Sequence, residues 1–217
     1  DRPGIAPLEL AILREDLARW RPEVEVLVVS VHWGSMYVDY PPPRVLELAE
    51  TLAAGGVDLV LGHHPHVMQG YRRSGRTLAL FSLGDACFNA RAGDFEASAA
   101  AVSRRESGVF TALVAATPGL LFEALRLDDD GVPRGVAEAE AASFAARLAR
   151  LSHGLAEGAE GFRRESAPQL LRYELESARQ YVRQGRWDRL ARLVVGLRPR
   201  HLPVLWQALR RLGRTPA

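Results

Sequence analysis

The sequence predicts an α/β fold, in which a layered sheet of parallel strands is followed by a helical appendage. Two short Val- and Leu-rich runs, 24–31 and 57–61, alternate with two segments of helical periodicity, 7–20 and 45–52. This helix–strand–helix–strand order favours parallel pairing in a sheet that helices cover. From about Val136 the sequence becomes helical in composition and spacing. We therefore expect residues 1–135 and residues 136–217 to form two distinct units.

Composition places the chain among ordinary globular proteins, because 47% of its residues are hydrophobic and 25% are charged. The net charge of +2 gives no reason to expect nucleic acid as a partner. The basic residues are all Arg, and many lie in the C-terminal third. No apolar run reaches the length of a membrane span. The single cysteine, Cys87, excludes an intrachain disulfide and a Cys-based zinc site, and we interpret it as a small buried residue.

The spacing of apolar residues, prolines and glycines predicts the helices and strands of the first sixty residues. Apolar residues at three- and four-residue steps predict a helix from Pro7 to Trp20, which Pro22 ends. The run from Val24 to Val31 reads as a strand buried on both faces, and Val57 to Leu61 as a second strand. Between them, Pro43 is placed to begin a helix and Gly55 to close it.

The later elements are a mixture of strands, loops and helices. We expect a turn at 72–76, a third strand at 77–83 and a long loop at 85–107. Thr117-Pro118-Gly119 predicts a hairpin between strands at 109–116 and 120–127, which 128–131 ends. The tail is predicted to contain four helices, at 137–152, 167–184, 187–197 and 202–212.

Four of the six histidines lie at or just after predicted strand ends: His32, His63, His64 and His66. Alternate residues of an extended segment share a side, so His64 and His66 can converge, with Pro65 stiffening the loop. His32 joins them if the two strands are neighbours. Neutral imidazole is a common ligand of divalent metals, and the cluster therefore predicts a metal site. The alternative is a hydrogen-bonded histidine cluster in a polar cleft.

The remaining two histidines, His153 and His201, fall in the helical tail, and we interpret both as structural.

Three motifs carry a resemblance to a known family. They are the segments VSVHWG at 29–34, GVDLVLGHHPHV at 56–67 and FSLG at 81–84. In order and spacing they resemble the late motifs of CapA-like proteins, which are associated with poly-γ-glutamate or capsule synthesis and share the calcineurin-like metallophosphoesterase fold. The resemblance covers roughly residues 2–89. It implies a layered metallophosphoesterase-like sandwich with two divalent metal ions between two sheets, and it does not distinguish Mn, Fe, Zn or Mg.

The resemblance also implies roles for particular residues. His32, His64 and His66 correspond to the late metal ligands, and His63 would face the substrate as a catalytic residue. Two ions about 3.5–4 Å apart would activate a water for in-line displacement, and a histidine could protonate the leaving group.

Three further residues are candidates for substrate binding. Arg72 and Arg73 could attract an anionic substrate, with a solvated turn as the alternative reading. Trp33 could form a pocket wall, with core packing as its alternative.

The sequence departs from the family pattern in three places. No Asp-x-His or Asn-His pair precedes His32, so the chain resembles the C-terminal portion of the domain. We expect the missing part upstream of Asp1 and expect this portion alone to be inactive. Asp85 stands where the family usually has Asn, and it could cap a turn or reach the site as a carboxylate. Met36 stands where an acidic residue often follows His-Trp-Gly.

The predicted function is that of a CapA-like protein of capsule or poly-γ-glutamate biosynthesis that performs metal-dependent, phosphoesterase-like hydrolysis. Two alternatives remain: a non-catalytic component that binds polyanion through the cleft or the Arg-rich tail, and a degenerate fold without metal. The expected partners are an anionic polymer or a phosphoester, and the capsule-synthesis machinery. The cytoplasm and the periphery of the cell envelope are both possible locations, because a targeting segment could lie upstream of Asp1.

Overall fold

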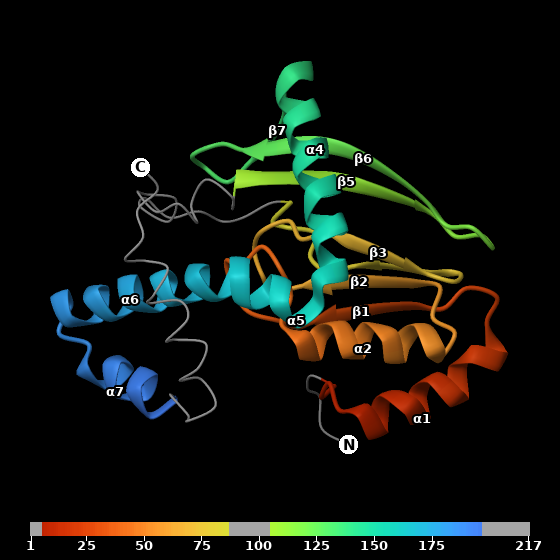
Figure 1. The fold of residues 1–217 in the computed structure, drawn as a ribbon, viewed down its shortest axis with the longest axis horizontal. Coiled ribbons are helices and arrows are strands. Elements are labelled where there is room, and N and C mark those ends of the chain that lie inside the picture. The colour runs from red at the N-terminus through yellow and green to blue at the C-terminus, as the bar shows by residue number, and fades with distance from the viewer. Residues whose placement is uncertain (1–5, 87–104, 197–217) are drawn as a thin grey trace.

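The computed structural model describes residues 6–86 and 105–196 of the chain and has a mixed α/β architecture (Figure 1). Its strands form a four-stranded and a three-stranded sheet. The strands are β1 Val28–His32, β2 Leu59–His63, β3 Tyr71–Ser74, β4 Thr77–Leu80, β5 Glu106–Leu113, β6 Gly119–Leu127 and β7 Pro133–Gly135. The helices are α1 Leu10–Trp20, α2 Pro43–Ala54, α4 Glu138–Gly154, α5 Gly158–Gly161, α6 Ala167–Arg183 and α7 Trp187–Gly196.

The first sheet has the strand order β1-β2-β4-β3. The strands β1, β2 and β4 are parallel, which confirms the predicted pairing, and β3 joins antiparallel at the edge. Helix α2 connects β1 to β2 and lies against one face of this sheet (Figure 1). It begins with Pro43 in its first turn and is capped by Gly55, as the sequence predicted.

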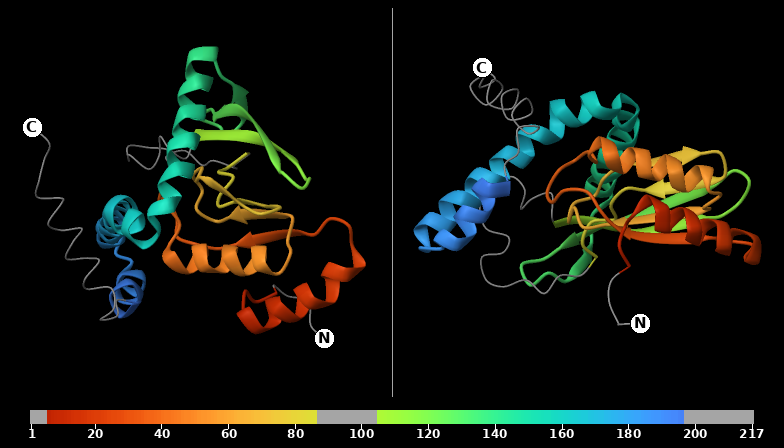
Figure 2. Two further views of the ribbon diagram at one scale, coloured as in Figure 1. Left: turned by 45° about the vertical axis from the view of Figure 1, so that its right-hand side comes forward. Right: turned by 90° about the horizontal axis from the view of Figure 1, so that it is seen from below.

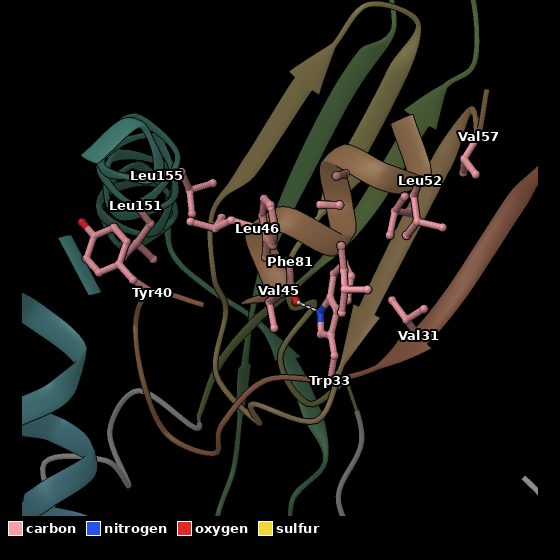
Figure 3. Packing of buried hydrophobic residues seen from close by; sticks show 14 of the residues in the cluster. Val31, Trp33, Tyr40, Val45, Leu46, Leu52, Val57, Phe81, Leu151 and Leu155 are labelled. Carbon is pink, nitrogen blue, oxygen red and sulfur yellow. Dashed lines mark hydrogen bonds between the residues drawn. The ribbon is translucent and has the colours of Figure 1, made fainter. Parts of the chain in front are cut away.

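A single cluster of buried residues joins α2 to the sheet (Figure 3). Leu52 and Phe81 are fully buried in it, and Trp33 is only 5% exposed. The cluster also contains Leu151 and Leu155, which come from the end of α4 and the 3₁₀ turn after it. The helical tail therefore completes the core of the first unit, while the predicted boundary at residue 135 remains a prediction.

The tail also binds the loop between β1 and α2 through polar contacts. Gln169 and Asp39 exchange two hydrogen bonds, of 2.9 and 3.0 Å. The Ser166 hydroxyl accepts a hydrogen bond from the Tyr40 backbone N–H at 2.7 Å and donates to the Tyr40 carbonyl at 3.1 Å. Figure 2 shows α6 reaching this loop from outside the sheet.

Several sequence predictions were wrong in detail. The first strand begins at Val28 rather than Val24, because the carbonyls of Val24 and Glu25 accept hydrogen bonds from Arg21 instead of continuing the sheet. The turn expected at 72–76 is confined to Gly75, with φ +57°, and Arg76, because residues 72–74 belong to strand β3. The third strand, β4, ends at Leu80 rather than Leu83.

Other predictions hold or lie outside the described residues. The hairpin of β5 and β6 is confirmed, and β7 adds an unpredicted third strand. Helices α4, α6 and α7 confirm three of the four expected tail helices. The fourth, at 202–212, lies outside the described residues, as do Cys87, His201 and most of the loop at 85–107. No helix within residues 6–86 and 105–196 is long and apolar enough to cross a membrane.

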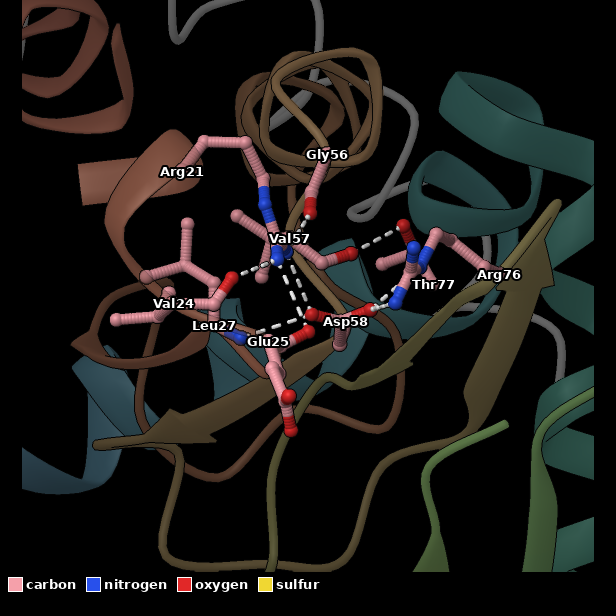
Figure 4. A network of polar contacts seen from close by, with 9 residues as sticks. All are labelled: Arg21, Val24, Glu25, Leu27, Gly56, Val57, Asp58, Arg76 and Thr77. Carbon is pink, nitrogen blue, oxygen red and sulfur yellow. Dashed lines mark hydrogen bonds and ion pairs between the residues drawn. The ribbon is translucent and has the colours of Figure 1, made fainter. Parts of the chain in front are cut away.

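The carboxylate of Asp58 is the centre of a buried ionic network at the start of β2 (Figure 4). Its side chain is fully buried and pairs with Arg21 at 2.7 Å and with Arg76 at 2.5 Å. It also accepts a hydrogen bond from the Leu27 backbone N–H at 2.8 Å. Burial by itself would raise the pKa of Asp58, but the hydrogen bonds from Leu27, Arg21 and Arg76 outweigh it and lower that pKa below the ordinary 3.8.

Replacement of Asp58 by Asn is predicted to destabilise the fold by about 2–4 kcal/mol, because one carboxylate oxygen becomes an N–H₂ group that faces other donors. Urea unfolding followed by circular dichroism measures the change. The matched control is Asp129→Asn, because Asp129 is 88% exposed and pairs only at the surface with Arg105. An equal loss of stability in both variants would contradict this prediction.

The same network predicts a pH dependence with a definite sign. The folded-state pKa of Asp58 lies below the ordinary 3.8, so its carboxylate stabilises the fold above pH 3.8 and loses this effect as the pH falls through that range. The difference in unfolding free energy between wild type and Asp58→Asn should therefore shrink below pH 3.8. Urea titrations at pH 7, 5, 4 and 3 check it, and a constant difference would speak against the assignment.

Candidate metal centre

The parallel register of β1 and β2 brings the predicted histidines to one edge of the sheet. His32 and His63 are the last residues of these strands and stand opposite each other in the register. The ring centroids of His32 and His64 lie 4.5 Å apart. Two histidines separated by more than thirty positions in the sequence are thus in ring contact because parallel strands end side by side.

The third histidine is placed by a second pairing. The Gln69 N–H donates to the Ser82 carbonyl at 3.1 Å, and Met68 forms a β-bridge with Leu83. This short antiparallel contact carries Asp85 to His66, where Asp85 Oδ1 lies 2.8 Å from His66 Nδ1. The rings of His64 and His66 have centroids 6.2 Å apart.

The backbone around these residues is strained. His64, His66 and Tyr37 have φ values of 101°, 57° and 60°, and they are the only described residues other than glycine with positive φ. Such conformations are uncommon for residues with a side chain and persist where surrounding contacts hold them. One such contact is the hydrogen bond from the Tyr37 N–H to the Pro65 carbonyl, at 2.8 Å. The strain is therefore concentrated where the two loops meet.

The electrostatics of the cluster favour neutral imidazole at His64. Burial lowers the pKa of His64 below the ordinary 6.5, and the neighbouring His32 and His66 lower it further. A neutral imidazole has a free ring nitrogen at neutral pH, which is the form that binds a metal.

The distances between the histidine rings can be compared with those expected in a histidine metal site. With metal–nitrogen distances of about 2.0–2.1 Å, two imidazoles on one ion have ring centroids about 4.5–6 Å apart. The His32–His64 and His64–His66 separations of 4.5 and 6.2 Å are close to this range. As the side chains stand, no group of three or more His, Cys, Asp or Glu in the described part of the chain is arranged to hold one ion. A shared ion therefore requires side-chain adjustment and remains a proposal.

Trp33 lies behind the site. Its indole Nε1–H donates to the Phe81 carbonyl at 2.9 Å, and its ring stacks on Phe81 with centroids 5.9 Å apart. Gly62, between them in β2, leaves the space that this contact occupies, because a Cβ there would lie 2.1 Å from the Phe81 carbonyl oxygen. The structure thus gives Trp33 a place in the core.

The two predicted arginines have hydrogen-bond partners elsewhere in the protein. Arg72 donates to Glu50 at 2.8 Å and to the Leu155 carbonyl at 2.6 Å, and Arg73 donates to the Pro118 carbonyl at 3.0 Å. Their guanidinium groups are therefore engaged with other parts of the protein. His63 is half-buried at the end of β2. Substrate binding by the arginines and catalysis by His63 remain predictions.

Two tyrosines near the site were not identified from the sequence. The Tyr37 ring lies 6.0 Å from the His66 ring and 4.8 Å from the Tyr173 ring, centroid to centroid. Tyr173 belongs to α6, so the helical tail reaches the neighbourhood of the histidines. Nothing in the local sequence signals either residue, because a positive φ at Tyr37 and a contact with Tyr173 arise only in the folded chain.

Comparison with known proteins relates one segment of the chain to a bacterial protein family. Residues 1–90 match the family described as bacterial capsule synthesis protein PGA_cap. The PGA biosynthesis protein CapA of Bacillus subtilis (strain 168) is 31% identical over 87 residues, and the capsule biosynthesis protein CapA of Bacillus anthracis is 29% identical over 93 residues. This segment of the chain is therefore similar to CapA-type proteins of capsule and PGA biosynthesis.

The matched region is limited in extent. It covers 40% of this chain and 23% of the B. subtilis CapA, and 41% of this chain and 23% of the B. anthracis CapA. All of the histidines at the strand ends lie inside it, whereas Tyr173 and the tail helices lie outside. The matched segment thus contains the candidate ligands, and helices of the tail within the described residues pack against it.

Replacement of Gly62 by Ala is predicted to destabilise the protein by about 1–3 kcal/mol, because the added methyl group overlaps the Phe81 backbone. Loss of the Trp33–Phe81 hydrogen bond should also change the tryptophan fluorescence. The control is Gly135→Ala, because nothing lies within 4 Å of a Cβ at that position. Urea unfolding compares the two, and wild-type stability in Gly62→Ala would refute the close packing.

Proposed function

We propose that this protein acts in capsule or poly-γ-glutamate biosynthesis as a metal-dependent hydrolase of phosphoesterase type, with a layered metallophosphoesterase-like fold. The observation that carries the proposal is the meeting of His32, His64 and His66 at the carboxyl ends of parallel strands. Sites in open α/β sheets form at this edge. The similarity to the two Bacillus proteins of PGA and capsule biosynthesis supports the biosynthetic context.

The three histidines would hold a divalent ion through their imidazole nitrogens. A bound ion of this kind supplies Lewis-acid polarisation of a phosphoryl oxygen and a more acidic water. In the family pattern a second ion requires carboxylate and amide ligands from early motifs, and no Asp-x-His or Asn-His pair precedes His32 in this chain. The two-metal reaction is therefore proposed for a protein that includes those motifs.

The chain's own residues have definable tasks in this proposal. The low pKa of His64 keeps its ring neutral and able to bind. The hydrogen bond between Trp33 and Phe81 fixes the backbone just after His32. His63, at the same sheet edge, would donate a proton to the leaving group.

An alternative role is the non-catalytic binding of an anionic polymer. Helix α6 presents Arg172, Arg179 and Arg183 as exposed side chains at seven- and four-residue spacing. This spacing places them near one side of the helix, where they can attract a polyanion. Such binding would not require the histidines.

Metal binding provides the first test. The chain is expected to bind one Mn²⁺ per molecule, and His64→Ala should weaken that binding at least tenfold because it removes the central ligand. Isothermal titration calorimetry measures both. His153→Ala is the matched control, because it removes an exposed histidine of α4 that is not among the histidines at the ends of β1 and β2. Equal Mn²⁺ affinity in wild type and His64→Ala would rule out the site.

Turnover provides the second test. Full-length protein with Mn²⁺ should hydrolyse a generic aryl phosphate, and His64→Ala should abolish this activity while His153→Ala retains it. Polyanion binding that is unchanged in His64→Ala, in protein that has no turnover, would favour the binding role instead.

A further inference from the structure

Asp85 places a largely buried carboxylate beside the histidines, and only one of its two oxygens has a partner. Its side chain is 10% exposed, and Oδ1 lies 2.8 Å from His66 Nδ1. The other oxygen, Oδ2, is buried and has no hydrogen-bond partner. A buried carboxylate oxygen without a partner is unfavourable, which indicates that the carboxylate is placed for a further interaction.

We propose that Asp85 is a positioning residue of the histidine site: Oδ1 fixes the ring of His66, and Oδ2 is held free for a cation or a hydrogen-bond donor bound there. This inference rests on the proposed metal binding. It assigns a role to the position at which the sequence departs from the family's usual Asn, and it concerns residues of this chain alone.

The direction of the hydrogen bond determines which nitrogen of His66 can bind a metal. A carboxylate only accepts hydrogen bonds, so His66 Nδ1 must be the donor and carries a proton. In the neutral ring the lone pair is then on Nε2, at the far side from Asp85. Carboxylate–histidine pairs of this kind orient metal-binding rings and raise their basicity.

Two features keep the pair in place. The antiparallel contact of Met68 with Leu83 fixes the separation of the two chain segments. Gly84, with φ +74°, makes the turn immediately before Asp85, and a Cβ there would lie 3.3–3.4 Å from Met68 and the Glu106 carbonyl. The positive φ of His66, 57°, shows that the other partner is also held in an uncommon conformation.

The test combines a tautomer measurement with a metal titration. In metal-free protein, ¹H–¹⁵N correlation spectra of the imidazole rings should show His66 protonated at Nδ1 in wild type. This tautomer should be kept in Asp85→Asn, whose amide oxygen still accepts, and lost in Asp85→Ala. Co²⁺ affinity, followed by the visible absorption of the bound ion, should fall ten- to hundredfold in Asp85→Ala. It should fall by a smaller factor in Asp85→Asn, which loses the charge and the free oxygen.

The controls separate this inference from the proposed function and from misfolding. Asp129→Asn removes one exposed carboxylate and should leave both readouts unchanged. Thermal unfolding verifies that each variant is folded. If Asp85→Ala does not fold, the Co²⁺ affinity of Asp85→Asn provides the test. A wild-type His66 protonated at Nε2, or Co²⁺ affinity in Asp85→Ala within twofold of wild type, would overturn the proposal. Wild-type affinity in Asp85→Asn would remove the role of Oδ2. The tautomer is read without metal, so an absence of turnover would leave this result standing.

Discussion

The register between β1 and β2 is the constraint on which the site depends, and Asp58 fixes it at the opposite end of the strands. The Leu27 N–H donates to the Asp58 carboxylate at 2.8 Å, and the Asp58 N–H donates to the Leu27 carbonyl at 2.9 Å. From this point the strands run in parallel to His32 and His63. A slip of one residue would turn each side chain of a strand to the other face of the sheet. The ionic network at the start of the strands therefore determines which residues meet at their carboxyl ends.

A second layer of contacts places the loops beyond those strands. The extended pairing around Met68 and Leu83 sets Asp85 beside His66. The loop after β1 is held by the helical tail, where Arg147 donates to Asp39 at 2.6 Å. It is also held by Gln69, just before β3, whose side chain donates to the Val38 carbonyl at 2.8 Å. These contacts offset the strained backbone at the loops, since positive φ at residues other than glycine costs on the order of 1–3 kcal/mol each.

The tail has two physical roles in this arrangement. Leu151 and Leu155 fill the core beside α2, so removal of the tail would expose apolar surface of residues 6–86. Tyr173 extends the same packing to Tyr37 and, through it, to the neighbourhood of His66. The surroundings of the candidate metal centre are therefore built from both parts of the chain, although only residues 1–90 match the family.

The sequence by itself determined the order of the main elements and the position of the histidines relative to them. Short β-branched runs and helical spacing are local properties, so the parallel strands β1 and β2, helix α2 and the β5–β6 hairpin were predictable. Strand ends were less certain: Arg72 and Arg73 read as a turn because their strand character depends on pairing with β4. Only the tertiary structure decided that Asp85 contacts His66, that Trp33 packs in the core and that Tyr173 lies beside Tyr37. Each of these contacts joins segments distant in the chain, and its energy comes from burial and hydrogen bonding that no local pattern encodes.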